Sequence, residues 1–240
     1  MSRADISDAR PSEVAVPIRD AASVLVLRRN AKGSAVLMGM RGKTAVFMPS
    51  KFVFPGGAVD AEDERIRLAR PLAPLHSRRL LSQPRGSRPP APHAIAAAAL
   101  RELAEETGLL VGKPSDQASG LASFDAAGLC PDAEPLLYMF RAITPPGRPR
   151  RFDAHFFAVD ASEIAGDPDD FSRACDELSH LHWVALDEAR RLDLPFITEV
   201  VLAELAELAQ STAWDKPLPV PDSVPFFDNR DLEPRFVQIT

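Results

Sequence analysis

The chain has 240 residues, of which 45% are hydrophobic and 26% are charged, and this composition is typical of a globular protein with a full hydrophobic core. Its formal net charge of −6 argues against non-specific binding to nucleic acid or to an anionic membrane. No apolar run has the length of a membrane span, and the polar residues before Asp20 lack the apolar core of a signal peptide. The 2 cysteines are too few for a disulfide framework, so we expect a cytoplasmic protein.

Apolar patterning predicts strands and helices that alternate along the chain. The segments typical of strands are residues 21–29, 34–41, 52–54, 136–143, 152–159 and 181–186. Apolar residues recur at helical spacing in residues 94–107 and 196–209. Elements mixed in this order favour an α/β fold with a mixed sheet. The 23 prolines concentrate in connecting stretches, which are residues 71–92, 131–149 and 217–234.

The first of these helices has two chemically different sides. Pro92 suits its first turn, and Gly108 suits a left-handed residue at its end. At about 100° per residue, one side holds Ala96, Leu100, Leu103, Ala104 and Thr107, and the opposite side holds Glu102, Glu105 and Glu106. We therefore expect the first side to pack on a sheet and the carboxylates to face outward.

The three glutamates repel one another, because side chains three or four residues apart are neighbours on a helix, at a cost of roughly 0.2–0.5 kcal/mol per exposed pair. A hard divalent cation would reverse this repulsion, since Mg²⁺ and Mn²⁺ prefer oxygen ligands. Arg101 stands four residues before Glu105 and can hold that carboxylate in place. Taken alone, however, such a cluster is more typical of a solvated acidic face than of a metal site.

The chain before the helix changes this balance. Residues 54–57, FPGG, end a short strand with two glycines, which permit close approach of a ligand and can offer it a backbone carbonyl. Residues 101–109, RELAEETGL, resemble the second half of the Nudix signature, and residues 54–57 resemble its opening. The sequence is therefore similar to the Nudix hydrolases.

This resemblance implies an α/β/α sandwich in which the signature helix lies beside a mixed sheet. It also implies hydrolysis of a diphosphate in a small-molecule substrate, with Mg²⁺ or Mn²⁺ as the cofactor. The residues that carry over as metal ligands are Glu102, Glu105, Glu106 and, through its carbonyl, Gly57. Arg101 carries over as the catalytic-site residue that orients the glutamates.

One part of the signature departs from the family pattern. Asp63 occupies the spacing at which the signature has a further glutamate, so we expect Asp63 to be a metal ligand, with Glu62 and Glu64 as alternatives. Residues from about 64 to 93 are inserted before the arginine, and such an interruption resembles the branch that includes peroxisomal acyl-coenzyme A diphosphatase-like hydrolases. The expected parts of the chain are an N-terminal arm (1–19), the Nudix domain (20–212) and a proline-rich C-terminal arm (213–240). The C-terminal arm either exchanges between the subunits of a homodimer or covers its own domain.

The insertion is rich in arginine, and arginine binds phosphate in a bidentate manner. We expect Arg65, Arg78 and Arg79 to bind a substrate phosphate away from the cleaved bond, which makes coenzyme A or acyl-coenzyme A the leading substrate. The insertion is equally compatible with a solvated loop, and a serine-rich coenzyme A motif is absent from residues 37–55. The alternatives are an ADP-ribose or dinucleotide pyrophosphatase and a non-catalytic, nucleotide-binding regulatory module.

Other residues have a functional and a plainer interpretation. Glu177 is a candidate base or metal-site residue, although a salt bridge in a loop is the more common role. Histidines that could contact phosphate, but are more often structural, are His155, His180 and His182. Aromatic residues that could stack on a base, but more often pack in a core, are Phe47, Phe52 and Phe152.

Overall fold

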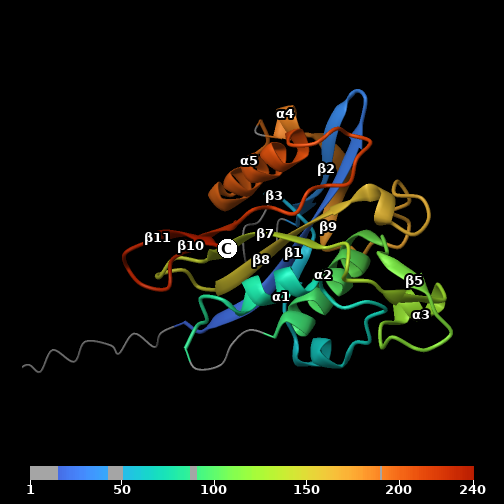
Figure 1. Ribbon diagram of the computed structural model, residues 1–240, viewed down its shortest axis with the longest axis horizontal. Helices are drawn as coiled ribbons and strands as arrows, with labels where there is room; N and C mark the ends of the chain where they lie inside the picture. The colour runs from blue at the N-terminus through green and yellow to red at the C-terminus, as the bar shows by residue number, and fades with distance from the viewer. Residues whose placement is uncertain (1–15, 43–50, 87–90, 190) are drawn as a thin grey trace, which may run out of the picture.

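The computed structural model describes residues 16–42, 51–86, 91–189 and 191–240. Its centre is a nine-stranded sheet in which neighbouring strands follow the order β11-β10-β7-β8-β1-β2-β3, while β4 pairs with β1 and β9 with β2 (Figure 1). The strands are β1 (Ile18–Asn30), β2 (Gly33–Arg41), β3 (Phe52–Val53), β4 (Gly56–Ala58), β7 (Leu137–Ile143), β8 (Arg151–Asp160), β9 (Leu178–Ala185), β10 (Val224–Asp228) and β11 (Arg235–Ile239). Two shorter strands, β5 (Gly112–Pro114) and β6 (Leu129–Pro131), form a separate antiparallel pair.

The sheet is mixed, because β1 runs parallel to β8 and antiparallel to β2. The helices are α1 (Pro74–Leu81), α2 (Pro92–Thr107), α3 (Ala122–Ala126), α4 (Leu186–Ala189) and α5 (Phe196–Gln210). Figure 1 shows α2 and α5 on opposite sides of the sheet. The α/β sandwich with a mixed sheet, predicted from the sequence, is thus confirmed.

Alternating side chains of β1 supply both layers of the core. Val24 and Val26 belong to the cluster that also contains Leu100 of α2. Leu25 and Leu27 belong to the second cluster, which α5 completes with residues such as Leu202 and Leu205. Because β1 is buried on both faces, it fixes the positions of the two helices relative to each other. No helix in the described ranges is long and apolar enough to cross a membrane.

The ends of α2 are those that its sequence predicts. Pro92 opens the helix, where its missing N–H costs no hydrogen bond. Gly108 ends it with a left-handed φ of 77°, and its N–H donates to the carbonyl of Ala104. One expectation was wrong, since the side that carries the glutamates is not wholly outward: Glu106 is only 1% exposed. The reason is that β4 covers this side of the helix.

The insertion is folded rather than a solvated loop in the part that the structure describes. It contains a 3-10 helix, Ala61–Arg65, at its start and then α1, whose Leu80 joins the core on the α2 side of the sheet. Arg79 is buried and donates to the carbonyls of Pro221 and Asp222, 2.7 and 2.6 Å away. The expected binding of substrate by Arg79 is therefore wrong, because its terminal nitrogens are used within the fold.

The C-terminal segment, predicted to be an arm, adds β10 and β11 to the sheet. β10 pairs in parallel with β7, and β11 forms the outer strand beside it. In Figure 1 this segment lies along its own domain, as one of the two predicted arrangements requires. The homodimer stays a prediction.

A buried ion pair ties these parts together. Arg141 of β7 and Asp153 of β8, both with side chains only 1% exposed, are joined by bonds of 2.8 and 2.7 Å. Arg85 of the insertion adds a third bond to Asp153, at 2.6 Å. Burial raises the pKa of Asp153, but the hydrogen bonds and charges of its cationic neighbours outweigh burial and hold the pKa below its usual value.

We predict that Asp153→Ala lowers the free energy of unfolding by about 3–5 kcal/mol, because it leaves the buried Arg141 without its carboxylate. Denaturant unfolding measures the change. The matched control is Glu188→Ala, which removes an exposed partner of Arg191 and should cost less than about 1 kcal/mol. Equal stability of the two variants would contradict the structural role of the buried pair.

Candidate functional site

The glutamates of α2 meet the two glycines of β4. The N–H of Gly56 donates to Oε2 of Glu106 at 2.7 Å. A Cβ built on Gly57 would lie 2.2 Å from Oε1 of Glu102, and one built on Gly56 would lie 2.4 Å from the carbonyl oxygen of Ala22. At position 56 only glycine therefore fits against the backbone of β1, whereas a Cβ at position 57 would displace the carboxylate of Glu102.

Arg101 is the centre of the hydrogen bonds around these acids. Its Nη1 donates to Glu102 at 2.8 Å and to Glu105 at 3.2 Å, and its Nη2 donates to the carbonyl of Ala58 at 3.0 Å. Burial lowers the pKa of Arg101, but the bonds and charges of Asp63 and Glu102 outweigh it and raise the pKa above its usual value. Arg101 thus stays charged and links α2 to β4.

Asp63 has a role different from the predicted one. It is fully buried, and its carboxylate accepts hydrogen bonds from Nε and Nη2 of Arg101 at 2.8 and 3.1 Å. Its Oδ2 also accepts from the backbone N–H of Asp60 at 2.8 Å. Both oxygens are therefore occupied, so the expectation that Asp63 is a metal ligand was wrong. Asp63 instead holds Arg101, which holds the glutamates.

Glu106 has an unbalanced environment. Among the described residues, its Oε1 is buried with no hydrogen-bond partner. Burial, with a smaller contribution from the neighbouring Glu102 and Glu177, raises the pKa of Glu106 to about 8. Burial also raises the pKa of Glu102. An unpaired, buried carboxylate oxygen beside two other glutamates is a donor set that fits a hard divalent cation.

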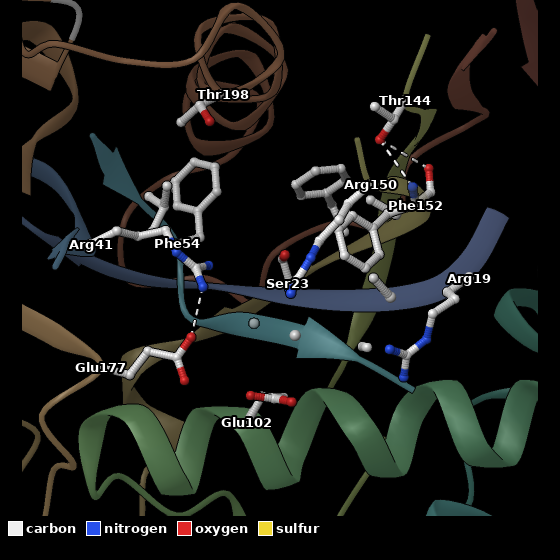
Figure 2. A pocket seen from close by; sticks show the side chains of 17 residues that line it. Arg19, Ser23, Arg41, Phe54, Glu102, Thr144, Arg150, Phe152, Glu177 and Thr198 are labelled. Atoms are coloured by element: carbon white, nitrogen blue, oxygen red, sulfur yellow. Dashed lines mark hydrogen bonds and ion pairs between the residues drawn. The ribbon is translucent and has the colours of Figure 1, made fainter. Parts of the chain in front are cut away.

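Glu102 and Glu177 line a cavity of about 300 Å³, which Figure 2 shows from close by. Glu102 reaches it from α2, beside the glycines of β4, and Glu177 reaches it from the segment before β9. Glu177 is 52% exposed and forms a salt bridge of 2.7 Å with Arg41. The salt bridge predicted as the plainer interpretation of Glu177 is therefore present, and it lies at the cavity.

The other candidates from the sequence lie in several places. Arg65 and Arg78 are exposed and do not line this cavity. His155 is buried, with Nδ1 3.0 Å from the hydroxyl of Tyr138, so it is structural. His180 and His182 lie on β9, Phe52 packs against His182, and none of the three lines the cavity. Phe152 does line it, and Phe47 lies outside the described residues.

A second group of possible metal ligands consists of Asp20, Asp153 and His155, whose ligand atoms lie within 4.8 Å of one another. Two arginines already neutralise it, because Arg85 donates to both aspartates and Arg141 donates to Asp153. Two positive charges in contact with the carboxylates oppose a further cation. The glutamates of α2 are therefore the better cation site.

The residues that sequence analysis missed at the cavity include Arg41, Phe54 and Arg150. The signal for Arg150 was present in the sequence, because it extends the alternating side-chain pattern of β8 by one residue. No corresponding signal marked Arg41, since its contact with Glu177 joins residues that are far apart in the chain.

Comparison with known proteins finds no family model that matches the chain. It is 27% identical over 217 residues to "Putative nudix hydrolase 7" of Caenorhabditis elegans, which covers 82% of this chain but only 62% of that relative's length. Among solved structures, the NUDIX hydrolase of Alicyclobacillus acidocaldarius is 28% identical, with a TM-score of 0.59, over 84% of this chain and 99% of that one. The predicted fold is confirmed by this likeness.

We predict that Gly57→Ala weakens Mn²⁺ binding by at least about tenfold while the fold survives, because the added methyl group displaces the flexible end of Glu102. Electron paramagnetic resonance titration measures the affinity, and circular dichroism measures the melting temperature. Gly42→Ala is the matched control, since a Cβ there meets no atom of the described residues within 4 Å. Equal Mn²⁺ affinity in the two variants would contradict a role of Glu102 as a metal ligand.

Proposed function

We propose that this chain, whose fold is that of the Nudix hydrolases, is a divalent-metal-dependent pyrophosphohydrolase that cleaves a small nucleoside diphosphate-X substrate. The 28% identity to a solved Nudix hydrolase across almost all of that protein supports this enzyme class. The observation that carries the proposal is the buried, unpaired oxygen of Glu106 beside Glu102 and the glycines of β4.

The ligands proposed for Mg²⁺ or Mn²⁺ are Glu102, Glu105, Glu106 and the carbonyl of Gly57. When bound, such an ion neutralises charge that develops on the phosphate oxygens and helps to activate the attacking water. The proposed site leaves Glu105 more accessible than its neighbours, because 54% of its side chain is exposed.

The surrounding residues hold the carboxylates in position. Arg101 keeps Glu102 and Glu105 on one side of the cluster, and Asp63 in turn fixes the guanidinium of Arg101. The N–H of Gly56 fixes one oxygen of Glu106, so that the other remains available. Such preorganisation matters because phosphoryl transfer depends mainly on positioning and charge neutralisation.

Glu177 is the candidate to accept a proton from the attacking water. It lines the cavity together with Glu102, and 52% of its side chain is exposed. Its salt bridge with Arg41 restricts the carboxylate to the side of the cavity beside β4 (Figure 2). Both interpretations drawn from the sequence, base and salt-bridge partner, are compatible with this position.

The substrate proposal keeps coenzyme A or acyl-coenzyme A first, on the resemblance of the interrupted signature. Of the three arginines expected to bind a remote phosphate, only Arg65 and Arg78 remain exposed, because Arg79 is used within the fold. ADP-ribose or a dinucleotide is the alternative substrate class.

We predict that Glu105→Gln and Glu106→Gln each lower kcat for a diphosphate substrate by at least about 100-fold. Substitutions of residues that only support metal ligands typically cost about 10- to 100-fold, and these two residues are proposed as ligands themselves. The fold should survive, because removing a charge relieves repulsion among the glutamates. Phosphate or nucleotide release, with and without chelator, measures the activity. Glu207→Gln changes an exposed acid on α5 and should leave turnover unchanged. Full activity in both site variants, or undiminished turnover in excess chelator, would contradict the proposal.

We also predict that coenzyme A is cleaved with a kcat/KM at least about tenfold above that of its dephospho form, since a charged hydrogen bond contributes roughly 1.5–3 kcal/mol. The double variant Arg65→Ala, Arg78→Ala should lose this preference and keep its activity on the dephospho form. Equal rates on both forms would move the substrate assignment to ADP-ribose or a dinucleotide. Nucleotide binding without any metal-dependent turnover would identify a regulatory module instead.

A further inference from the structure

The floor of the cavity is one face of the β1–β8 pair. Phe152, Ala154 and Phe156, which alternate along β8, all line it. They stand in parallel register with Arg19, Ala21 and Ser23 of β1, which line it as well. Arg150 precedes the first of these residues by two positions and also lines the cavity, so it continues the same row.

Hydrogen bonds of Arg151 and Phe152 hold the backbone next to Arg150 in place. Arg151 donates to the carbonyls of Thr144 and Asn229 at 3.0 and 2.7 Å. The N–H of Phe152 donates to Oγ1 of Thr144 at 3.0 Å. The backbone on the C-terminal side of Arg150 is therefore held, and Figure 2 shows the Arg150 side chain extending into the cavity toward Ser23.

The arginines of the cavity differ in their acid partners. Arg19 forms a salt bridge of 3.2 Å with Asp60, and Arg41 forms one of 2.7 Å with Glu177. For Arg150, no salt bridge or hydrogen bond of the side chain is found within the part of the chain that the structure describes. A cation that faces a cavity without a carboxylate partner retains its donors for an anion.

We propose that Arg150 binds an oxyanion of the substrate's diphosphate, in the cavity that it lines together with Glu102. This inference rests on the proposed function, because it divides the two phosphates of one substrate between two sites. The glutamates of α2 take one phosphate through a divalent cation, and the guanidinium of Arg150 takes the other in a bidentate manner. The residue thereby selects substrates with a second phosphate next to the one at the glutamates.

The matched control lies two residues earlier on the same loop. Arg148 is also exposed, but it lines a neighbouring cavity, formed with residues such as Phe196 and Phe227, that does not contain Glu102. Arg148→Ala and Arg150→Ala remove the same charge from the molecule, so that long-range electrostatics are equal in the two variants. Arg150→Lys keeps the charge but removes the planar pair of donors.

The experiment titrates the full-length wild type and these variants with α,β-methylene-ADP, a diphosphate analogue that resists cleavage, and with AMP, both in Mg²⁺. Calorimetry then gives the dissociation constants. We expect Arg150→Ala to weaken binding of the analogue by about 10- to 100-fold, Arg150→Lys to recover part of the loss, and Arg148→Ala to match the wild type. Binding of AMP should change less than threefold in every variant.

Equal affinity of Arg150→Ala and the wild type for the analogue would overturn the assignment, as would equal losses in the Arg148 and Arg150 variants or for AMP and the analogue. Turnover of the diphosphate panel by the wild type tests the proposed function separately. An inactive wild type that binds the analogue through Arg150 would refute hydrolysis and keep the anion site. A wild type that binds neither nucleotide and cleaves no member of the panel would refute both proposals.

Discussion

The close approach of β4 to α2 is the constraint on which the rest of the site depends. The strand can lie between β1 and the carboxylates because residue 56 has no Cβ to meet the backbone of Ala22 and residue 57 has none to displace Glu102. Gly56 then donates its N–H to Glu106, and Glu102 fills the space that a Cβ on Gly57 would take. A side chain at position 56 would push the strand away from β1, and one at position 57 would displace the carboxylate of Glu102.

This proximity has an electrostatic cost that the surrounding residues offset only in part. Arg101 compensates Glu102 and Glu105, and it is itself held by Asp63 from the start of the insertion. For Glu106 the compensation is incomplete, since burial raises its pKa to about 8 and one oxygen has no partner among the described residues. A buried carboxylate with an unpaired oxygen is unfavourable in a folded protein. Its presence here suggests that a ligand completes the site.

The basic insertion contributes to the fold more than to the chemistry in the residues that the structure describes. Arg79 fastens α1 to the C-terminal segment, and Arg85 joins Asp20 and Asp153 of the central strands. The arginine that faces the cavity without an acid partner, Arg150, comes instead from the β7–β8 connection. Composition alone pointed to the arginines of the insertion, and none of the arginines that line the cavity, which are Arg19, Arg41 and Arg150, belongs to it.

Local patterns predicted the elements whose signals are themselves local. The limits of α2 followed from Pro92 and Gly108, and the central strands followed from their apolar runs. β10 and β11 were missed, because short strands with nearby prolines resemble a connection until their pairing with β7 is known.

The site residues divide in the same way. The grouping of the glutamates of α2 follows from helical geometry alone. The burial of Glu106, the hold of Asp63 on Arg101 and the salt bridge between Arg41 and Glu177 depend on contacts between distant segments. Spacing gave Asp63 the correct position in the signature but not its role, which depends on where its two oxygens point.

The most direct test of the account is to locate Mn²⁺ by anomalous diffraction from crystals of the protein equilibrated with the ion. The account predicts an anomalous peak about 2.0–2.4 Å from carboxylate oxygens of Glu102, Glu105 or Glu106, beside the carbonyl of Gly57. A peak at Asp20, Asp153 and His155 instead, or no peak near α2 at saturating Mn²⁺, would contradict it.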